Sequence, residues 1–169
     1  MSLIKDSLFK EGPAPETVIM IDPFLKAVDW RLPLVEYVGP ILGNLYKRHS
    51  AERKPYWYSY IHYKPCVQLN NLAKEVTGAL NKGLLLPEGT KVVCYTAQGD
   101  PIVDVESSVT IVSGLKSRNN EKIEHVWINS NRHVFTSLLG KDVSAKDASN
   151  QKKVFKEIVD YLNRNAPSL

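Results

Sequence analysis

The sheet of this 169-residue protein is encoded in residues 90–138, TKVVCYTAQGDPIVDVESSVTIVSGLKSRNNEKIEHVWINSNRHVFTSL. Apolar and β-branched runs alternate there with short turn signals such as Gly99-Asp100-Pro101. The predicted strands are Thr90–Thr96, Ile102–Leu115 with a break near Ser107-Ser108, Ile123–Asn129 after the polar turn Ser117–Glu121, and His133–Leu138, which can pair back across Ser130-Asn131. Because short turns link these runs, we expect hairpin-connected antiparallel strands.

Helical patterns flank this region. Apolar residues recur at three- and four-residue spacing in Pro33–Lys47, in Leu69–Leu80 and after a capping-box-like start at Ser144. Gly39-Pro40 predicts a kink in the first of these helices. Two further runs, Thr17–Ile21 and the aromatic Tyr56–Tyr63, read as strands. The sequence therefore predicts an α+β fold, in which about three helices pack on an antiparallel sheet.

Length and composition indicate one packed domain. With 43% hydrophobic and 24% charged residues, the chain is neither disordered nor fibrous. The prolines near the start predict a flexible arm over residues 1–16, followed by a single domain over residues 17–169. Because no apolar run has the length of a signal peptide or a membrane span, we expect an intracellular, cytoplasmic protein. Cys66 and Cys94 lack metal-binding spacing and are expected to be reduced thiols.

Positive charge is concentrated around the aromatic run. The chain has 22 Lys and Arg against 18 acidic residues. The residues expected to bind an anionic surface are Lys47, Arg48, Arg53, Lys54 and Lys64, with Tyr56, Tyr58 and Tyr60 as contact aromatics. Cations neutralise phosphates, and exposed aromatic rings stack on bases or enter a lipid headgroup layer. The alternative is that the cations form a solvated helix end and the aromatics belong to the core.

Candidate catalytic and metal-binding sets are weak in this sequence. His125 and His133 would face each other if a hairpin folded about Asn129, but two ligands do not make a zinc site. Ser107 or Ser108 could be combined with His125 and Asp104, yet the sequence has no G-x-S-x-G nucleophile elbow. Asp104 and Glu106 would share the wet face of a strand, and no phosphate-binding glycine loop is present. We therefore expect no catalysis, no metal and no cofactor.

The order of elements resembles the core of rhabdovirus matrix proteins. The elements that carry the resemblance are the proline-containing arm (Gly12 to Pro15), the strand Thr17–Ile21, the helix Pro33–Lys47, the basic loop and the strand Tyr56–Tyr63. The resemblance implies a small basic protein that self-associates, lies on an anionic membrane and contacts nucleocapsid. The budding signals PPxY and P(T/S)AP of that family are absent.

The function expected from these observations is that of a non-catalytic interaction or assembly protein, which binds an anionic membrane surface or nucleic acid. One alternative is a small-molecule-binding domain or enzyme with a pocket in a curved antiparallel sheet, lined by Trp57, Tyr60, Tyr95 and Trp127 with His125 or Asp104 inside. A second alternative is a protein–protein adaptor that uses the exposed tyrosines.

Overall fold

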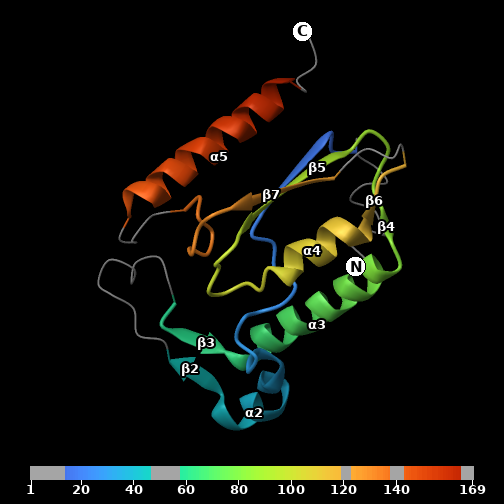
Figure 1. The fold of residues 1–169 in the computed structure, drawn as a ribbon. Coiled ribbons are helices and arrows are strands. Elements are labelled where there is room, and N and C mark those ends of the chain that lie inside the picture. The colour runs from blue at the N-terminus through green and yellow to red at the C-terminus, as the bar shows by residue number, and fades with distance from the viewer. Residues whose placement is uncertain (1–13, 47–57, 119–122, 138–142, 165–169) are drawn as a thin grey trace.

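A parallel three-stranded sheet forms the centre of the molecule (Figure 1). The computed structural model describes residues 14–46, 58–118, 123–137 and 143–164. The sheet has the order β1-β5-β7, where β1 is Thr17–Ile21, β5 is Lys91–Ala97 and β7 is Glu124–Ile128. β1 and β7 each pair in parallel with β5, so all three strands end at the same edge of the sheet.

Helices cover both faces of this sheet. Val93, Tyr95 and Ala97 of β5 form a core with Ile128, Phe135 and Val154, so this face packs on α5 (Ala145–Arg164). The alternate β5 residues face α4 (Glu106–Gly114), because successive side chains of a strand point to opposite faces. Burial of β5 on both faces is typical of a parallel strand, and residues 92–97 are all buried.

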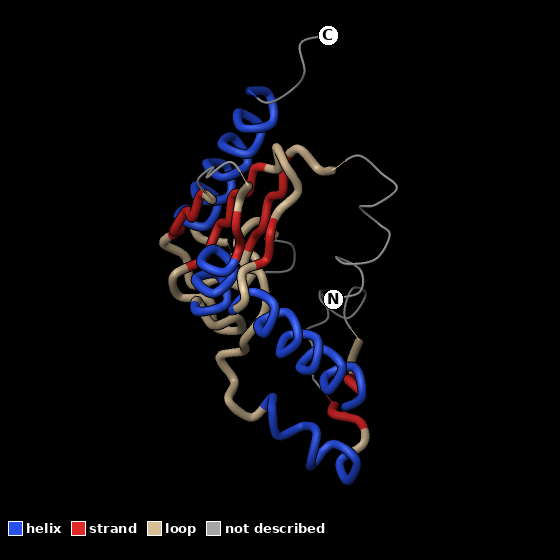
Figure 2. Tube along the Cα trace, turned by 90° about the vertical axis from the view of Figure 1, so that its right-hand side faces the viewer, coloured by secondary structure: helices blue, strands red, loops and turns tan. Residues whose placement is uncertain are grey.

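The remaining elements lie beyond α4. α3 (Tyr63–Asn81) packs on α4, and α2 (Val35–Leu42), preceded by the 3-10 turn η1 (Leu32–Leu34), packs on α3. An antiparallel pair, β2 (Asn44–Tyr46) and β3 (Tyr60–His62), lies beside α2. A short parallel pair is formed by β4 (Leu84–Leu85) and β6 (Leu115–Lys116). Figure 2 shows this succession from the side.

The prediction of an antiparallel sheet was wrong. Residues 106–114, expected to be strand, form the helix α4, which connects β5 to β7 as a parallel crossover. The β-branched residues of this segment misled the prediction, because tertiary packing overrides local propensity. Residues 133–136, expected to pair back as a strand, form a turn instead.

Several local predictions were confirmed. The strand Thr17–Ile21 is present with the predicted bounds. α3 includes the predicted periodic segment but begins earlier, at Tyr63, where the ring of His62 accepts a hydrogen bond from Lys64 N–H. The start of α5 is capped as expected, since Asp147 N–H donates to Ser144 Oγ at 3.1 Å and Ser144 N–H donates to Asp147 Oδ2 at 3.1 Å.

Two other elements are shorter than expected. The segment Pro33–Lys47 forms η1 and α2, and Pro40 lies inside α2. The segment Tyr56–Tyr63, described only from residue 58, forms β3.

Close packing of α4 on α3 depends on Gly114. A Cβ atom at this position would lie 2.6 Å from Leu80 Cβ and 2.8 Å from the Leu80 carbonyl oxygen. Gly114→Ala is therefore expected to lower the free energy of unfolding by about 1–3 kcal/mol, measured by urea denaturation. Gly78→Ala in α3 is the matched control, because a Cβ there meets nothing within 4 Å. It should raise stability by up to about 1 kcal/mol. Equal effects of the two variants would contradict this account.

Candidate active site

Three titratable residues follow the carboxyl ends of the parallel strands. Asp22 directly follows β1, Asp100 follows β5 by three residues, and His133 follows β7 by five. The loops after β5 and β7 are joined by the hydrogen bond from Gly99 N–H to the Ser130 carbonyl oxygen, at 2.9 Å. The carboxyl edge of an open α/β sheet is the usual place for a functional site, because loops from adjacent strands converge there.

Asp100 is held as a buried hydrogen-bond acceptor. Its Oδ1 accepts from the N–H of Ile102 at 2.7 Å and from the N–H of Val103 at 3.0 Å. Its Oδ2 lies 2.9 Å from Nδ1 of His133. The side chain is 2% exposed. These three contacts fix the orientation of the carboxyl group toward the imidazole.

His133 is oriented by Asp100 and remains accessible. A carboxylate only accepts hydrogen bonds, so the Nδ1 atom carries the proton and Nε2 of the neutral ring has the lone pair. About a third of the side chain, 34%, is exposed, so a reactant can reach the ring. The preceding residue is anchored as well: Arg132 N–H donates to Ser130 Oγ at 3.1 Å, and Arg132 Nε lies 3.3 Å from Asp147 Oδ2.

The turn that carries His133 is strained. Val134 has a φ of 49°, in the left-handed region that a β-branched residue rarely adopts. The next residue, Phe135, is 1% exposed and anchors the turn in the core between the sheet and α5. Backbone strain of this kind persists only where surrounding packing enforces it, and it occurs preferentially at functional sites.

Most of the predicted anionic-surface residues cannot be placed. Lys47, Arg48, Arg53, Lys54 and Tyr56 lie outside the described residues. Lys64 is exposed in the first turn of α3, and Tyr58 and Tyr60 are 88% and 65% exposed. Binding of these residues to an anionic membrane surface or nucleic acid stays a prediction.

The structure does not assemble the constellations considered from sequence. His125 is not opposite His133; it pairs in register with Cys94, and its Nε2 lies 2.9 Å from Thr96 Oγ1. Partial burial lowers the pKa of this histidine. Ser107 serves the backbone instead, because its Oγ accepts from Lys26 N–H at 2.9 Å.

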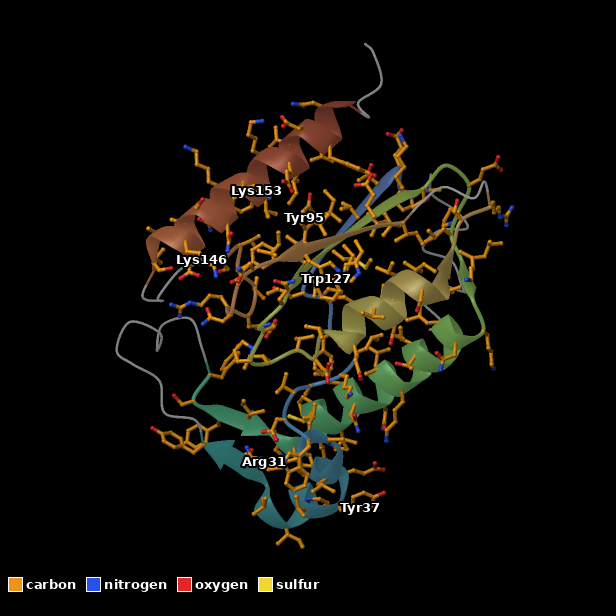
Figure 3. The ribbon with its side chains drawn as sticks, viewed as in Figure 1. Arg31, Tyr37, Tyr95, Trp127, Lys146 and Lys153 are labelled. Carbon is orange, nitrogen blue, oxygen red and sulfur yellow. The ribbon has the colours of Figure 1, made fainter. Side chains whose placement is uncertain are left out.

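The other two sets are likewise dispersed. Asp104 and Glu106 lie at the start of α4 rather than on a strand, and both pair with Lys26 Nζ. Tyr95 points toward α5 and Trp127 toward α4, so they cannot line one pocket (Figure 3). Trp57 lies outside the described residues.

Two further expectations concern membranes and thiols. Within residues 14–46, 58–118, 123–137 and 143–164, no helix has both the length and the apolar character that crossing a membrane requires.

Cys66 and Cys94 are free thiols in the structure, with Cys94 buried in the sheet. Burial raises the pKa of the Cys94 thiol.

Sequence reasoning missed the Asp100–His133 pair because it assumed hairpins. A weak signal was present: a titratable residue follows each of two strand-forming runs at similar distance, in Gln98-Gly99-Asp100 and in Asn131-Arg132-His133. In an antiparallel hairpin, consecutive strands end at opposite edges, so these two residues would have been separated. Only the parallel arrangement brings them together.

Comparisons with known proteins agree with the parallel α/β fold. No family model and no curated protein matches the sequence. Among solved structures, a metagenome-derived lipolytic enzyme from the study of LipS and LipT matches with a TM-score of 0.64 and 12% identity, over 97% of this chain and 59% of that one. A soluble variant of monoglyceride lipase from Saccharomyces cerevisiae matches with a TM-score of 0.65 and 13% identity, over 99% of this chain and 58% of that one.

These matches correct the resemblance and the function expected from sequence. The structural neighbours are lipolytic α/β hydrolases and not viral matrix proteins, so the matrix resemblance was wrong. The expectation of a non-catalytic assembly protein is overturned by the same finding, and the alternative of an enzyme is better supported, although its antiparallel sheet was wrong. The chain has the α/β fold of these lipolytic enzymes and spans less than three fifths of their length.

Proposed function

We propose that Asp100 and His133 are the acid–base pair of a carboxylic ester hydrolase. The observation that carries this proposal is the 2.9 Å contact between a buried carboxylate and a partly exposed imidazole at the carboxyl edge of a parallel sheet. The same fold occurs in lipolytic enzymes, which supports ester hydrolysis over other reactions that use a general base.

The geometry suits His133 for proton transfer in both directions. Nε2 accepts the proton of a nucleophilic O–H group while the oxygen attacks the ester carbonyl carbon, and the electron pair of the C=O bond moves to oxygen. Asp100 then stabilises the imidazolium through the Nδ1–H hydrogen bond. When the tetrahedral intermediate collapses, the C–O bond to the alcohol breaks and His133 returns the proton to the leaving oxygen. The acyl group stays on the nucleophile oxygen until water, which gives its proton to the same Nε2, attacks the carbonyl carbon; the bond to the nucleophile oxygen then breaks, that oxygen takes the proton back, and the carboxylic acid is released.

The residues discussed above include no assigned nucleophile. No segment of the 169 residues has the form G-x-S-x-G, and about two fifths of each neighbour's length has no counterpart in this chain. We propose that the attacking O–H group belongs to a serine. A fluorophosphonate probe tests this assignment, because it labels an activated serine covalently and does not label a water-using enzyme.

The test of the function measures kcat for ester hydrolysis in variants of two histidines. The protein is purified from the organism that makes it, together with any partner bound to it. The substrate is p-nitrophenyl butyrate. His133→Gln is expected to lower kcat by about 10²–10⁴-fold, because general-base catalysis contributes this much. His125→Gln is the matched control, since this ring bonds Thr96 and lies outside the site. Absence of ester hydrolysis by the wild-type protein, or equal effects of both substitutions, would overturn the proposal.

A further inference from the structure

The first two turns of α5 hold the segment that carries His133. Three side chains from this end of the helix, where Figure 3 labels Lys146, donate hydrogen bonds to the chain that follows β7. The contacts are Lys146 Nζ to Asn129 Oδ1 at 2.8 Å, Asn150 Nδ2 to the Asn129 carbonyl oxygen at 3.0 Å, and Gln151 Nε2 to the Thr136 carbonyl oxygen. Since Asn129 precedes His133 and Thr136 follows it, the helix holds the chain on both sides of this histidine.

Asp147 of α5 makes a fourth contact, the nearest to His133 along the chain. Its Oδ2 lies 3.3 Å from Nε of Arg132, the residue directly before His133. The side chain of Asp147 is 7% exposed and that of Arg132 is 32% exposed. Because solvent and salt screen a partly buried ion pair less than an exposed one, this contact restrains the arginine side chain.

Both members of this ion pair are fixed by further hydrogen bonds. Asp147 Oδ2 accepts from Ser144 N–H at 3.1 Å and from Ser144 Oγ–H at 2.9 Å. Arg132 N–H donates to Oγ of the buried Ser130 at 3.1 Å. The Ser130 carbonyl oxygen in turn accepts from Gly99 N–H, in the loop that carries Asp100. Arg132 is therefore restrained by its side chain and by its backbone.

Capping of α5 does not account for all of these contacts. The hydrogen bonds between Asp147 and Ser144 are those of a helix cap, and they would form without Arg132. Val154 and Ile158 lie on the same face of α5 as Asp147 and pack on the core, because residues seven and eleven positions apart share a helix face. This face therefore begins with a carboxylate that pairs with the His133 turn and continues with apolar residues that pack on the sheet.

We propose that Asp147 and Arg132 are positioning residues for His133. Their ion pair holds the backbone that precedes the imidazole, so that Nδ1 lies against Asp100 and Nε2 faces the reactant. The left-handed φ of Val134, on the other side of His133, requires such a restraint, because a strained turn persists only where its surroundings enforce it. The effect on catalysis rests on the proposed hydrolase function, whereas the effect on the imidazole does not.

The orientation of the imidazole is tested by NMR of the protein labelled with ¹⁵N at histidine. The His133 signals are identified by their loss in His133→Gln. In the wild type, the neutral ring should carry its proton on Nδ1 alone, because Asp100 accepts it. Arg132→Met keeps the aliphatic stem and removes the ion pair, so both tautomers of the neutral ring should be populated. Arg132→Lys keeps the charge and should restore the single tautomer.

Kinetics test the consequence for the reaction. Arg132→Met should lower kcat for p-nitrophenyl butyrate by about 10–10²-fold with little change in KM, because a misplaced base slows the chemical step and not binding. Lys156→Met is the matched control, since it removes another ion pair of α5, in which Lys156 Nζ lies 3.0 Å from Asp160 Oδ2. Its kcat should be unchanged. Each variant should lower Tm by less than about 4 °C, so both stay folded in the assay.

A purely stabilising role for Arg132 would give a different result. Arg132→Met would then lower Tm but keep the wild-type tautomer of His133 and the wild-type kcat, and this outcome overturns the proposal. The NMR measurement needs no catalysis, so it decides the positioning role even if the wild-type protein does not hydrolyse the ester. If His133→Gln abolishes hydrolysis while Arg132→Met behaves as the wild type, the positioning assignment fails and the hydrolase assignment survives.

Discussion

Asp100→Asn is expected to lower kcat for ester hydrolysis by about 10⁴-fold, the loss associated with a histidine held in the wrong tautomer. The asparagine oxygen can keep the hydrogen bonds from the N–H groups of Ile102 and Val103, so the loop should retain its shape. The amide nitrogen then replaces Oδ2 beside His133. Because an amide nitrogen only donates, it binds the unprotonated form of Nδ1 and leaves the proton on Nε2, where the ring cannot act as a base.

The control for this variant is Asp104→Asn, a chemically identical change four residues along the same segment. Asp104 Oδ1 accepts from Glu106 N–H at 3.0 Å, a bond that asparagine can also make, and its ion pair with Lys26 lies at the surface. Hydrolysis should be nearly unchanged in this variant. The assay measures kcat and KM with p-nitrophenyl butyrate, together with Tm. An Asp100→Asn protein that retains wild-type kcat would exclude Asp100 as the orienting acid.

Phe135→Ala is expected to have the largest effect on stability, a loss of about 3–5 kcal/mol in the free energy of unfolding. Phe135 is the largest of the fully buried side chains among the described residues and lies in the core cluster with Val93, Tyr95 and Val154. Its removal leaves a cavity between the sheet and α5. The same change loosens the turn that begins at His133, so hydrolysis should fall in the fraction of protein that remains folded.

Phe155→Ala in α5 is the matched control for this substitution. That ring is 47% exposed, so its removal should cost less than about 1.5 kcal/mol, since only part of the side chain leaves an apolar contact. Urea denaturation of the two variants and the wild type gives the comparison directly. Equal losses would show that the core is not organised around Phe135.

Elements with strong local signals were predictable from the sequence. Thr17–Ile21 is β-branched and ends at Asp22-Pro23, and α5 combines a cap at Ser144 with helical apolar spacing. In both, local preference and burial agree, which is the condition under which pattern reasoning succeeds. Sheet direction had no such local signal.

Residues 102–115 show why the topology was missed. Their β-branched residues favour a strand, but Asp104 accepts from Glu106 N–H, and Ser107 N–H donates to the Asp104 carbonyl oxygen at 2.9 Å, so a helix begins there. The clue to a parallel sheet was in β5 itself, whose run Val-Val-Cys-Tyr-Thr-Ala lacks polar alternation. Read as a strand covered on both faces, it requires a crossover helix and not a hairpin.

The candidate site was missed for the same reason, because it depends on contacts between residues that are far apart in the sequence. Asp100 and His133 are 33 positions apart, and neither has a distinctive neighbouring motif. The residue sets considered from sequence used His125 more often than His133, but in the structure His125 bonds Thr96 and not Asp100. The distinction depends on strand direction and register, which no local pattern specifies.

The left-handed conformation of Val134 limits how this protein can be improved. Substitutions that relax the peptide, such as glycine or asparagine at this position, would release conformational energy and favour the native state. They would also free the imidazole beside it to sample orientations away from its carboxylate partner. Selection for heat resistance alone would therefore be expected to erode turnover first at this residue, so thermostable descendants of the protein should be screened for activity whenever position 134 has changed.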